Sequence, residues 1–137
     1  MFDDIVKRVL ANEGALAGKS LSNLADKLDG RPIHVATACS GTDSPIVALD
    51  MICKSLFEQT GSTLHIDHVF SCEIEYFKAA FIQRNFNPKL LFRDIRELGR
   101  EQATTAFGKL ATVPGNVDVM IAGTSCVDFS GLNNEKK

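Results

Sequence analysis

Cys126 is the residue of this sequence that stands best placed to act as a nucleophile. Residues 117–121 (Val-Asp-Val-Met-Ile) form a short apolar run that predicts a buried parallel strand, and a loop beginning at Gly123 follows it. Ligands of open parallel α/β sheets bind beyond the carboxyl ends of the strands, and Cys126 falls there. Taken alone, a free cysteine is more often a small buried apolar residue than a reactive thiol. Whether Cys126 is a nucleophile or a buried apolar residue therefore depends on which residues follow the other predicted strands.

A turn rich in small residues follows another apolar run, at residues 33–38. Ser40, Gly41 and Thr42 lead from that run into a predicted helix with Pro45 in its first turn. Such a turn lets a ligand approach backbone N–H groups closely, and the helix dipole favours an anionic group there. The signal is weak alone, because many strand-to-helix turns have this composition and no Gly-x-Gly-x-x-Gly fingerprint is present.

Two acidic residues follow the remaining predicted strands. Glu73 can accept hydrogen bonds from both ribose hydroxyls of a nucleoside, or it can complement a helix dipole. From the sequence alone, the two roles are about equally well supported. Glu75, one residue inside the predicted helix, fits the dipole role better. Asp94 can accept from an adenine amine, although capping a helix that begins at Ile95 is commoner for an isolated Asp. Because parallel strands end at one edge, we expect Glu73, Asp94 and Gly41 to share one pocket.

The elements that would position these residues alternate between strand and helix. The apolar spacing predicts two helices first, at 2–12 and 21–28, with Ser20 as the N-cap of the second. It then predicts strands at 33–38, 64–71, 90–92 and 117–121, helices at 45–58 and 74–86, and a helix within 95–107. This alternation indicates βαβ units and a parallel sheet.

Composition narrows the class of protein but gives no function. The chain has 137 residues, 45% hydrophobic and 23% charged, with a net charge of -2, which is typical of one soluble globular domain. We expect no signal peptide, because the start is acidic, and no membrane span, because the apolar runs are short. The cysteines lack Cys-x-x-Cys spacing, which disfavours a zinc site and suggests reduced thiols in an intracellular compartment: Cys39, Cys53, Cys72 and Cys126.

Taken in order, these segments resemble the first four motifs of the cytosine-C5 DNA methyltransferases, and the divergent fungal members most. The matching segments are 39–42, 73–75, 93–95 and 125–130, together with the helix after Glu73, and the resemblance covers about residues 33–134. It implies a Rossmann-like, class I S-adenosylmethionine-dependent methyltransferase fold of the α/β class. We expect a partial parallel sheet in the order 3-2-1-4 with flanking helices. Residues 1–30 would be a helical extension, and residues 31–137 an S-adenosylmethionine-binding half-domain.

The resemblance also implies roles for single residues. Ser40 and Gly41 would form the turn under the methionine part of S-adenosylmethionine, with Thr42 beside them. Glu73 would hold the ribose. Three residues would contact the adenine or lie beside it. Ile74 would pack on the ring, Asp94 would accept a hydrogen bond from its amine, and Ile95 would lie next to Asp94. No metal is implied. Cys126 would add to C6 of a cytosine flipped out of double-stranded DNA, which activates C5 for methyl transfer and leaves S-adenosylhomocysteine as product.

The sequence departs from the family pattern at several positions. Cys39 stands where the family usually has Phe, and Asp43 and Ser44 stand where it has Gly. Ser125 and Val127 replace the Pro and Gln that normally flank the cysteine. The family's later motifs do not follow within 137 residues, so we expect a nuclear enzyme fragment that is inactive alone.

Two alternatives stay open at this point. One is a non-catalytic module that binds S-adenosylmethionine or a partner protein, and the other is an RNA cytosine-C5 methyltransferase. In either case residues 117–121 would be an edge strand, through which the chain would self-associate or contact its missing C-terminal half.

Overall fold

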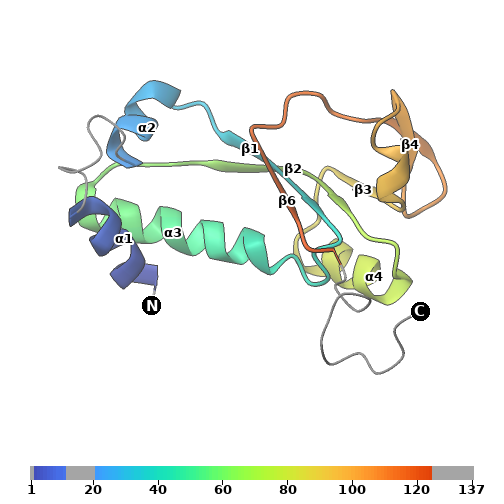
Figure 1. The fold of residues 1–137 in the computed structure, drawn as a ribbon, viewed down its shortest axis with the longest axis horizontal. Helices are drawn as coiled ribbons and strands as arrows, with labels where there is room; N and C mark the ends of the chain where they lie inside the picture. The colour runs from blue at the N-terminus through green and yellow to red at the C-terminus, as the bar shows by residue number, and fades with distance from the viewer. Residues whose placement is uncertain (1, 12–20, 125–137) are drawn as a thin grey trace.

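The computed structural model describes residues 2–11 and 21–124. Figure 1 shows the order of the elements along the chain. The helices are α1 (Phe2–Ala11), α2 (Leu21–Leu28), α3 (Ser44–Thr60) and α4 (Tyr76–Asn85), with a single 3₁₀ turn, η1 (Ile95–Glu97). The strands are β1 (Ile33–Ala38), β2 (Ile66–Cys72), β3 (Leu90–Phe92), β4 (Gln102–Thr104), β5 (Leu110–Thr112) and β6 (Val119–Ala122).

Four of these strands form a parallel sheet in the order β3-β2-β1-β6. The predicted α/β class and the predicted order 3-2-1-4 are therefore confirmed, with β6 as the fourth strand. The architecture is consistent with a Rossmann-like methyltransferase fold. Because the strands are parallel, their carboxyl ends meet at one edge of the sheet (Figure 1).

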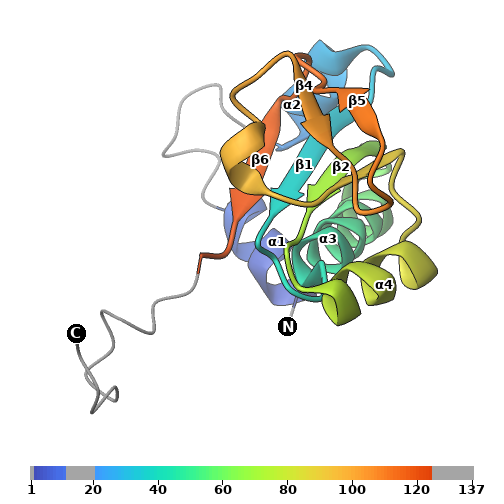
Figure 2. The same ribbon diagram turned by 90° about the vertical axis from the view of Figure 1, so that its right-hand side faces the viewer.

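Helices cover one face of the sheet, and a small antiparallel hairpin covers the other (Figure 2). On the helical side, α1 lies against α3, and Val6, Leu56 and Leu64 form a buried apolar cluster. On the hairpin side, the rings of Phe70 and Phe92 meet edge to face at 5.4 Å. The two layers bury residues of β1, β2 and β3, as a parallel sheet requires, whereas the edge strand β6 stays largely exposed. The proposed boundary at residue 30 stays a prediction.

The helix predicted within residues 95–107 is wrong for most of that segment. Only η1 is helical, and β4 then pairs with β5 as a hairpin whose turn contains Gly108 at φ 79°. Gly99 weakens any longer helix at this point. Strand pairing replaces it, because Thr104 faces Leu110 across the hairpin and Thr105 bridges to Phe92 at the end of β3.

Smaller shifts affect the site directly. The structure begins β2 at Ile66 rather than residue 64, and α4 at Tyr76 rather than residue 74. Glu75 therefore precedes α4 instead of lying inside it, which corrects the prediction. The fourth strand runs over Val119–Ala122 rather than 117–121. In the part of the chain that the structure describes, no helix is long and apolar enough to cross a membrane.

Candidate functional site

The turn after β1 has an unusual backbone. Cys39, Gly41 and Asp43 all take positive φ values, of 52°, 66° and 52°. This left-handed region suits glycine and costs other residues roughly 1–2 kcal/mol, with Asp among the better tolerated. A Cβ built at Gly41 would meet nothing within 4 Å, so open space adjoins its backbone. The turn thus exposes main-chain groups to whatever binds at this edge.

Glu73 lies at the end of β2 and turns its side chain toward that turn. Its carboxylate accepts hydrogen bonds from the Gly41 N–H at 3.2 Å and from the Glu75 N–H at 3.0 Å. The residue is only 5% exposed. A carboxylate has about four acceptor sites, so each oxygen keeps a lone pair for a further donor. The next residue, Ile74, is 59% exposed at the same edge.

Asp94 follows β3 and caps η1, which was one of the two roles that the sequence left open. It accepts from the Arg96 N–H at 2.9 Å and pairs with the Arg96 guanidinium at 2.6 Å. The Arg96 side chain, followed by its backbone N–H, holds the pKa of Asp94 at about 2, so the carboxylate is ionised at neutral pH. Ile95, beside it, is 38% exposed.

The Cys39 thiol interacts electrostatically with the carboxylates of Glu73 and Asp94. Burial raises the pKa of its thiol, and the negative charges of Glu73 and Asp94 raise that pKa further. The structure places Glu73 against the Gly41 turn and Asp94 just past the end of the neighbouring strand β3, and the pocket shared by all three residues stays a prediction. Ser40 and Thr42 complete the turn, and the Thr42 side chain contacts the Ser44 hydroxyl at 2.9 Å.

The segment that leads to Cys126 reaches the same turn. The Gly123 N–H donates to the Ala38 carbonyl at 2.9 Å, and a Cβ at Gly123 would lie 3.1 Å from the Cys39 carbonyl oxygen. Any residue other than glycine at this position would require the Cys39 backbone or the Gly123 backbone to move. Cys126 itself, with Ser125 and Val127, lies outside the described residues.

The start of β6 is also held to β1. The Arg31 guanidinium pairs with Asp118 at 2.7 Å, and the His34 N–H donates to the same carboxylate at 2.9 Å. The Arg31 side chain and then the His34 N–H lower the pKa of Asp118 to about 2. These bonds fix where β6 begins.

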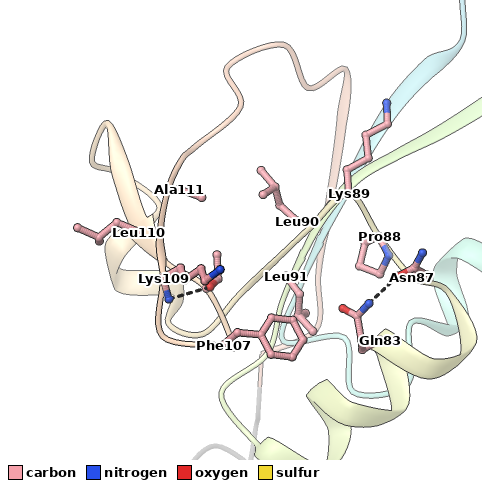
Figure 3. Close-up of a pocket in the computed structure, with 11 residues that line it drawn as sticks. Gln83, Asn87, Pro88, Lys89, Leu90, Leu91, Phe107, Lys109, Leu110 and Ala111 are labelled. Atoms are coloured by element: carbon pink, nitrogen blue, oxygen red, sulfur yellow. Dashed lines mark hydrogen bonds between the residues drawn. The ribbon is translucent and has the colours of Figure 1, made fainter.

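A groove of about 640 Å³ opens elsewhere, between the end of α4, β3 and the hairpin (Figure 3). Its lining residues are Gln83, Asn87, Pro88, Lys89, Leu90, Leu91, Thr105, Phe107, Lys109, Leu110 and Ala111. None of them belongs to the cluster at the strand ends, so nucleotide binding is not assigned to this groove. Within residues 2–11 and 21–124, no group of three or more metal-ligating side chains is assembled.

Sequence reasoning missed one functional candidate. In the sequence, Asp43 stood out only because the family usually has glycine at this position. In the structure, it is completely buried beside the turn. The available signal was its residue type, since Asp tolerates a left-handed backbone better than most residues do. One of its partners, Ser71, lies 28 residues away on β2, so the local pattern gave no hint of that contact.

Comparison with known proteins now supports one family. No protein-family model matches the chain. DNA (cytosine-5-)-methyltransferase DMT5 of Cryptococcus neoformans var. grubii is 53% identical over 134 residues, which is 98% of this chain. The protein of the same name from Verticillium dahliae is 45% identical over 107 residues, or 74% of the chain. Both relatives support the cytosine-C5 DNA methyltransferase family for this chain.

The chain spans only 5% and 4% of the length of these two methyltransferases. The family assignment agrees with the resemblance that the motifs carry.

Proposed function

We propose that this chain forms the cofactor-binding and nucleophile-bearing part of a DNA cytosine-C5 methyltransferase. One observation carries the proposal: the Glu73 carboxylate accepts from the Gly41 N–H of the glycine turn, at the sheet edge where β3 also ends, two residues before Asp94. A ribose acceptor beside an accessible glycine turn is typical of nucleotide-binding α/β sheets.

The residues at this edge fit S-adenosylmethionine. Glu73 keeps free acceptor sites for the two ribose hydroxyls, and exposed Ile74 offers an apolar surface to the adenine ring. Asp94 is ionised, but within the described residues all four hydrogen bonds to its carboxylate come from Arg96, so it would accept from the adenine amine only once the Arg96 side chain moves aside. Ser40, Gly41 and Thr42 would lie under the methionine part, and Ile95 beside the adenine. S-adenosylmethionine supplies an electrophilic methyl group when bound.

The chemistry that we propose for the chain's own residues centres on Cys126. Its thiolate would form a bond to C6 of cytosine, which pushes electron density onto C5 so that C5 can take the methyl group. Loss of the C5 proton would then allow the Cys126–C6 bond to break and free the thiolate. The contact of Gly123 with the Cys39 backbone supports this role, because it brings the preceding segment to the proposed cofactor turn.

The partners follow from the same proposal. Double-stranded DNA with a flipped cytosine would be the substrate, which places the enzyme in the nucleus, and S-adenosylhomocysteine would be the second product. The remainder of a longer protein would cover β6, which is an edge strand with Val119 and Met120 40% and 50% exposed.

Two experiments test the proposal. Calorimetry of the chain with S-adenosylmethionine and S-adenosylhomocysteine should show binding of both, and absence of any binding would contradict the cofactor assignment. In the long protein that carries this sequence, Cys126→Ser should abolish methylation of DNA and spare cofactor binding, because a serine hydroxyl is a far weaker nucleophile.

The matched control for the second experiment is Cys53→Ser. Cys53 is a half-buried cysteine of α3 that packs beside the α1–α3 cluster, away from the strand ends. It should leave turnover unchanged. Methylation of an RNA substrate in preference to DNA would instead support the RNA methyltransferase alternative. Cofactor binding without turnover on either nucleic acid would support the non-catalytic module.

A further inference from the structure

Asp43 is a fully buried carboxylate at the junction of the glycine turn and α3. Thr37 donates its hydroxyl to Oδ1 at 2.7 Å, and Ser71 donates its hydroxyl to Oδ2 at 2.6 Å. The Ser40 hydroxyl also donates to Oδ1. Thr37 and Ser71 are themselves completely buried. Three hydroxyl donors thus compensate a carboxylate that water does not reach.

This arrangement is not ordinary helix capping. An Asp at the N-cap normally accepts from a backbone N–H in the first helical turn. Asp43 occupies the N-cap of α3 but makes no side-chain capping bond. Its carboxylate points into the sheet instead and reaches hydroxyls on β1, β2 and the turn. The Asp43 side chain therefore stabilises the turn rather than the first turn of α3.

His68 extends the network on β2. Its Nε2 lies 2.8 Å from the Ser71 Oγ and 3.7 Å from the Asp43 Oδ2. The tautomer of the ring decides whether Nε2 or the Ser71 Oγ donates in their contact. Burial lowers the pKa of His68, which favours the neutral ring. The contacts thus run from His68 through Ser71 to Asp43.

A bulge in β2 brings these side chains together. Val35 pairs with His68 but Ala36 pairs with Phe70, so Val69 is an extra residue in the strand. In a regular strand, residues three apart point to opposite faces. The bulge lets His68 and Ser71 share the face that holds Asp43, while Val69 and Phe70 pack in the core with Phe92.

We propose that Asp43 is a positioning residue for the cofactor: through Ser40 it holds the turn in the shape that presents Gly41 beside Glu73. This inference rests on the proposed function, because it assigns the turn to cofactor binding. Asp43 touches no cofactor atom in this role. It acts on the conformation of the Ser40–Thr42 backbone, because its carboxylate accepts from the Ser40 hydroxyl while Thr37 and Ser71 hold that carboxylate to the sheet.

The test compares three substitutions of Asp43 by calorimetry with S-adenosylhomocysteine. Asp43→Gly keeps the left-handed backbone accessible but removes the acceptor, and it should weaken binding by about tenfold or more. Asp43→Ala should lose at least as much, because alanine also resists a φ of 52°. Asp43→Asn keeps an oxygen for Thr37 and Ser40 and tolerates the same φ, so it should rescue binding to within about threefold of the native chain.

Asp29→Gly is the matched control. Asp29 also has a positive φ, of 48°, but is exposed and remote from the turn, so its replacement should leave the affinity unchanged. Ser40→Ala, alone and combined with Asp43→Gly, tests the link between the two residues. If Asp43 acts through Ser40, the double variant should bind no more weakly than the weaker single variant. If Asp43→Gly does not fold, Ser40→Ala alone decides the case: it should weaken binding, and an unchanged affinity would overturn the positioning role.

The outcomes separate the two proposals. A native chain that binds neither S-adenosylmethionine nor S-adenosylhomocysteine overturns the proposed function and this inference with it. A native chain that binds, together with an Asp43→Gly variant of equal affinity, overturns the positioning role alone. Additive losses for Ser40→Ala and Asp43→Gly would also overturn it, because they would mean that the two residues act independently.

Discussion

Replacing Glu73 with glutamine tests the site most directly. The carboxylate is 5% exposed, and each of its oxygens already accepts from a backbone N–H, at 3.2 Å from Gly41 and 3.0 Å from Glu75. In Glu73→Gln one oxygen becomes an NH₂ group that faces a backbone donor instead of accepting from it. Loss of such a buried bond destabilises a fold by roughly 1–3 kcal/mol. We therefore expect a lower melting temperature, but a folded chain.

The effect on ligand binding is larger and more specific. A carboxylate that holds a ribose diol makes two charge-assisted hydrogen bonds, and the amide can replace only one of them. Losing one costs about 1.5–3 kcal/mol, which corresponds to roughly 10-fold to 150-fold in the dissociation constant. Glu75→Gln is the matched control two residues away. Glu75 is exposed before α4, so its loss costs roughly 0.3–1 kcal/mol, or less than about sixfold.

The assay is calorimetric titration of both variants with S-adenosylhomocysteine and with an analogue that lacks both ribose hydroxyls. Glu73→Gln should weaken binding of S-adenosylhomocysteine far more than Glu75→Gln does. The native chain and Glu73→Gln should bind the analogue equally well. Equal losses for the two variants, or a full loss toward the analogue, would refute the ribose assignment.

Three further predictions follow from the fold. Gly123→Ala places a Cβ 3.1 Å from the Cys39 carbonyl oxygen, so it should weaken S-adenosylhomocysteine binding severalfold, whereas Gly115→Ala, which meets nothing within 4 Å, should not; equal affinities would contradict the close approach. Burial lowers the pKa of His68 below its ordinary 6.5, although Asp43, Asp50 and Asp67 oppose this, so the unfolded chain binds the proton more readily. Thermal unfolding should therefore show stability falling as the pH drops below about 6.5, and His68→Gln should remove that slope; a slope that survives the substitution would assign it to other groups. Finally, light scattering should detect concentration-dependent association of the chain through β6, which Val119→Lys should reduce, and a native monomer at all micromolar concentrations would contradict an open edge.

The sequence by itself determined the fold class and the placement of the candidate site. Apolar runs of strand length alternating with helical spacing are local signals, and they predicted all four strands of the parallel sheet to within a few residues. The contact of Glu73 with the Gly41 turn followed from topology, because parallel strands end at one edge whatever their side chains are, and the shared pocket with Asp94 stays a prediction. Motif resemblance supplied the family, and the comparison with two fungal methyltransferases agrees with it.

The tertiary structure decided what depends on partners far apart in the chain. The segment after Asp94 became a hairpin because Thr104 and Thr105 pair with strands that local spacing does not reveal. The role of Asp43 emerged only when a bulge in β2 turned His68 and Ser71 onto one face. A bulge changes the facing of every residue beyond it, so no alternation pattern read along one strand could have placed those side chains. Local periodicity fixes the elements, whereas the register between elements fixes which polar groups meet.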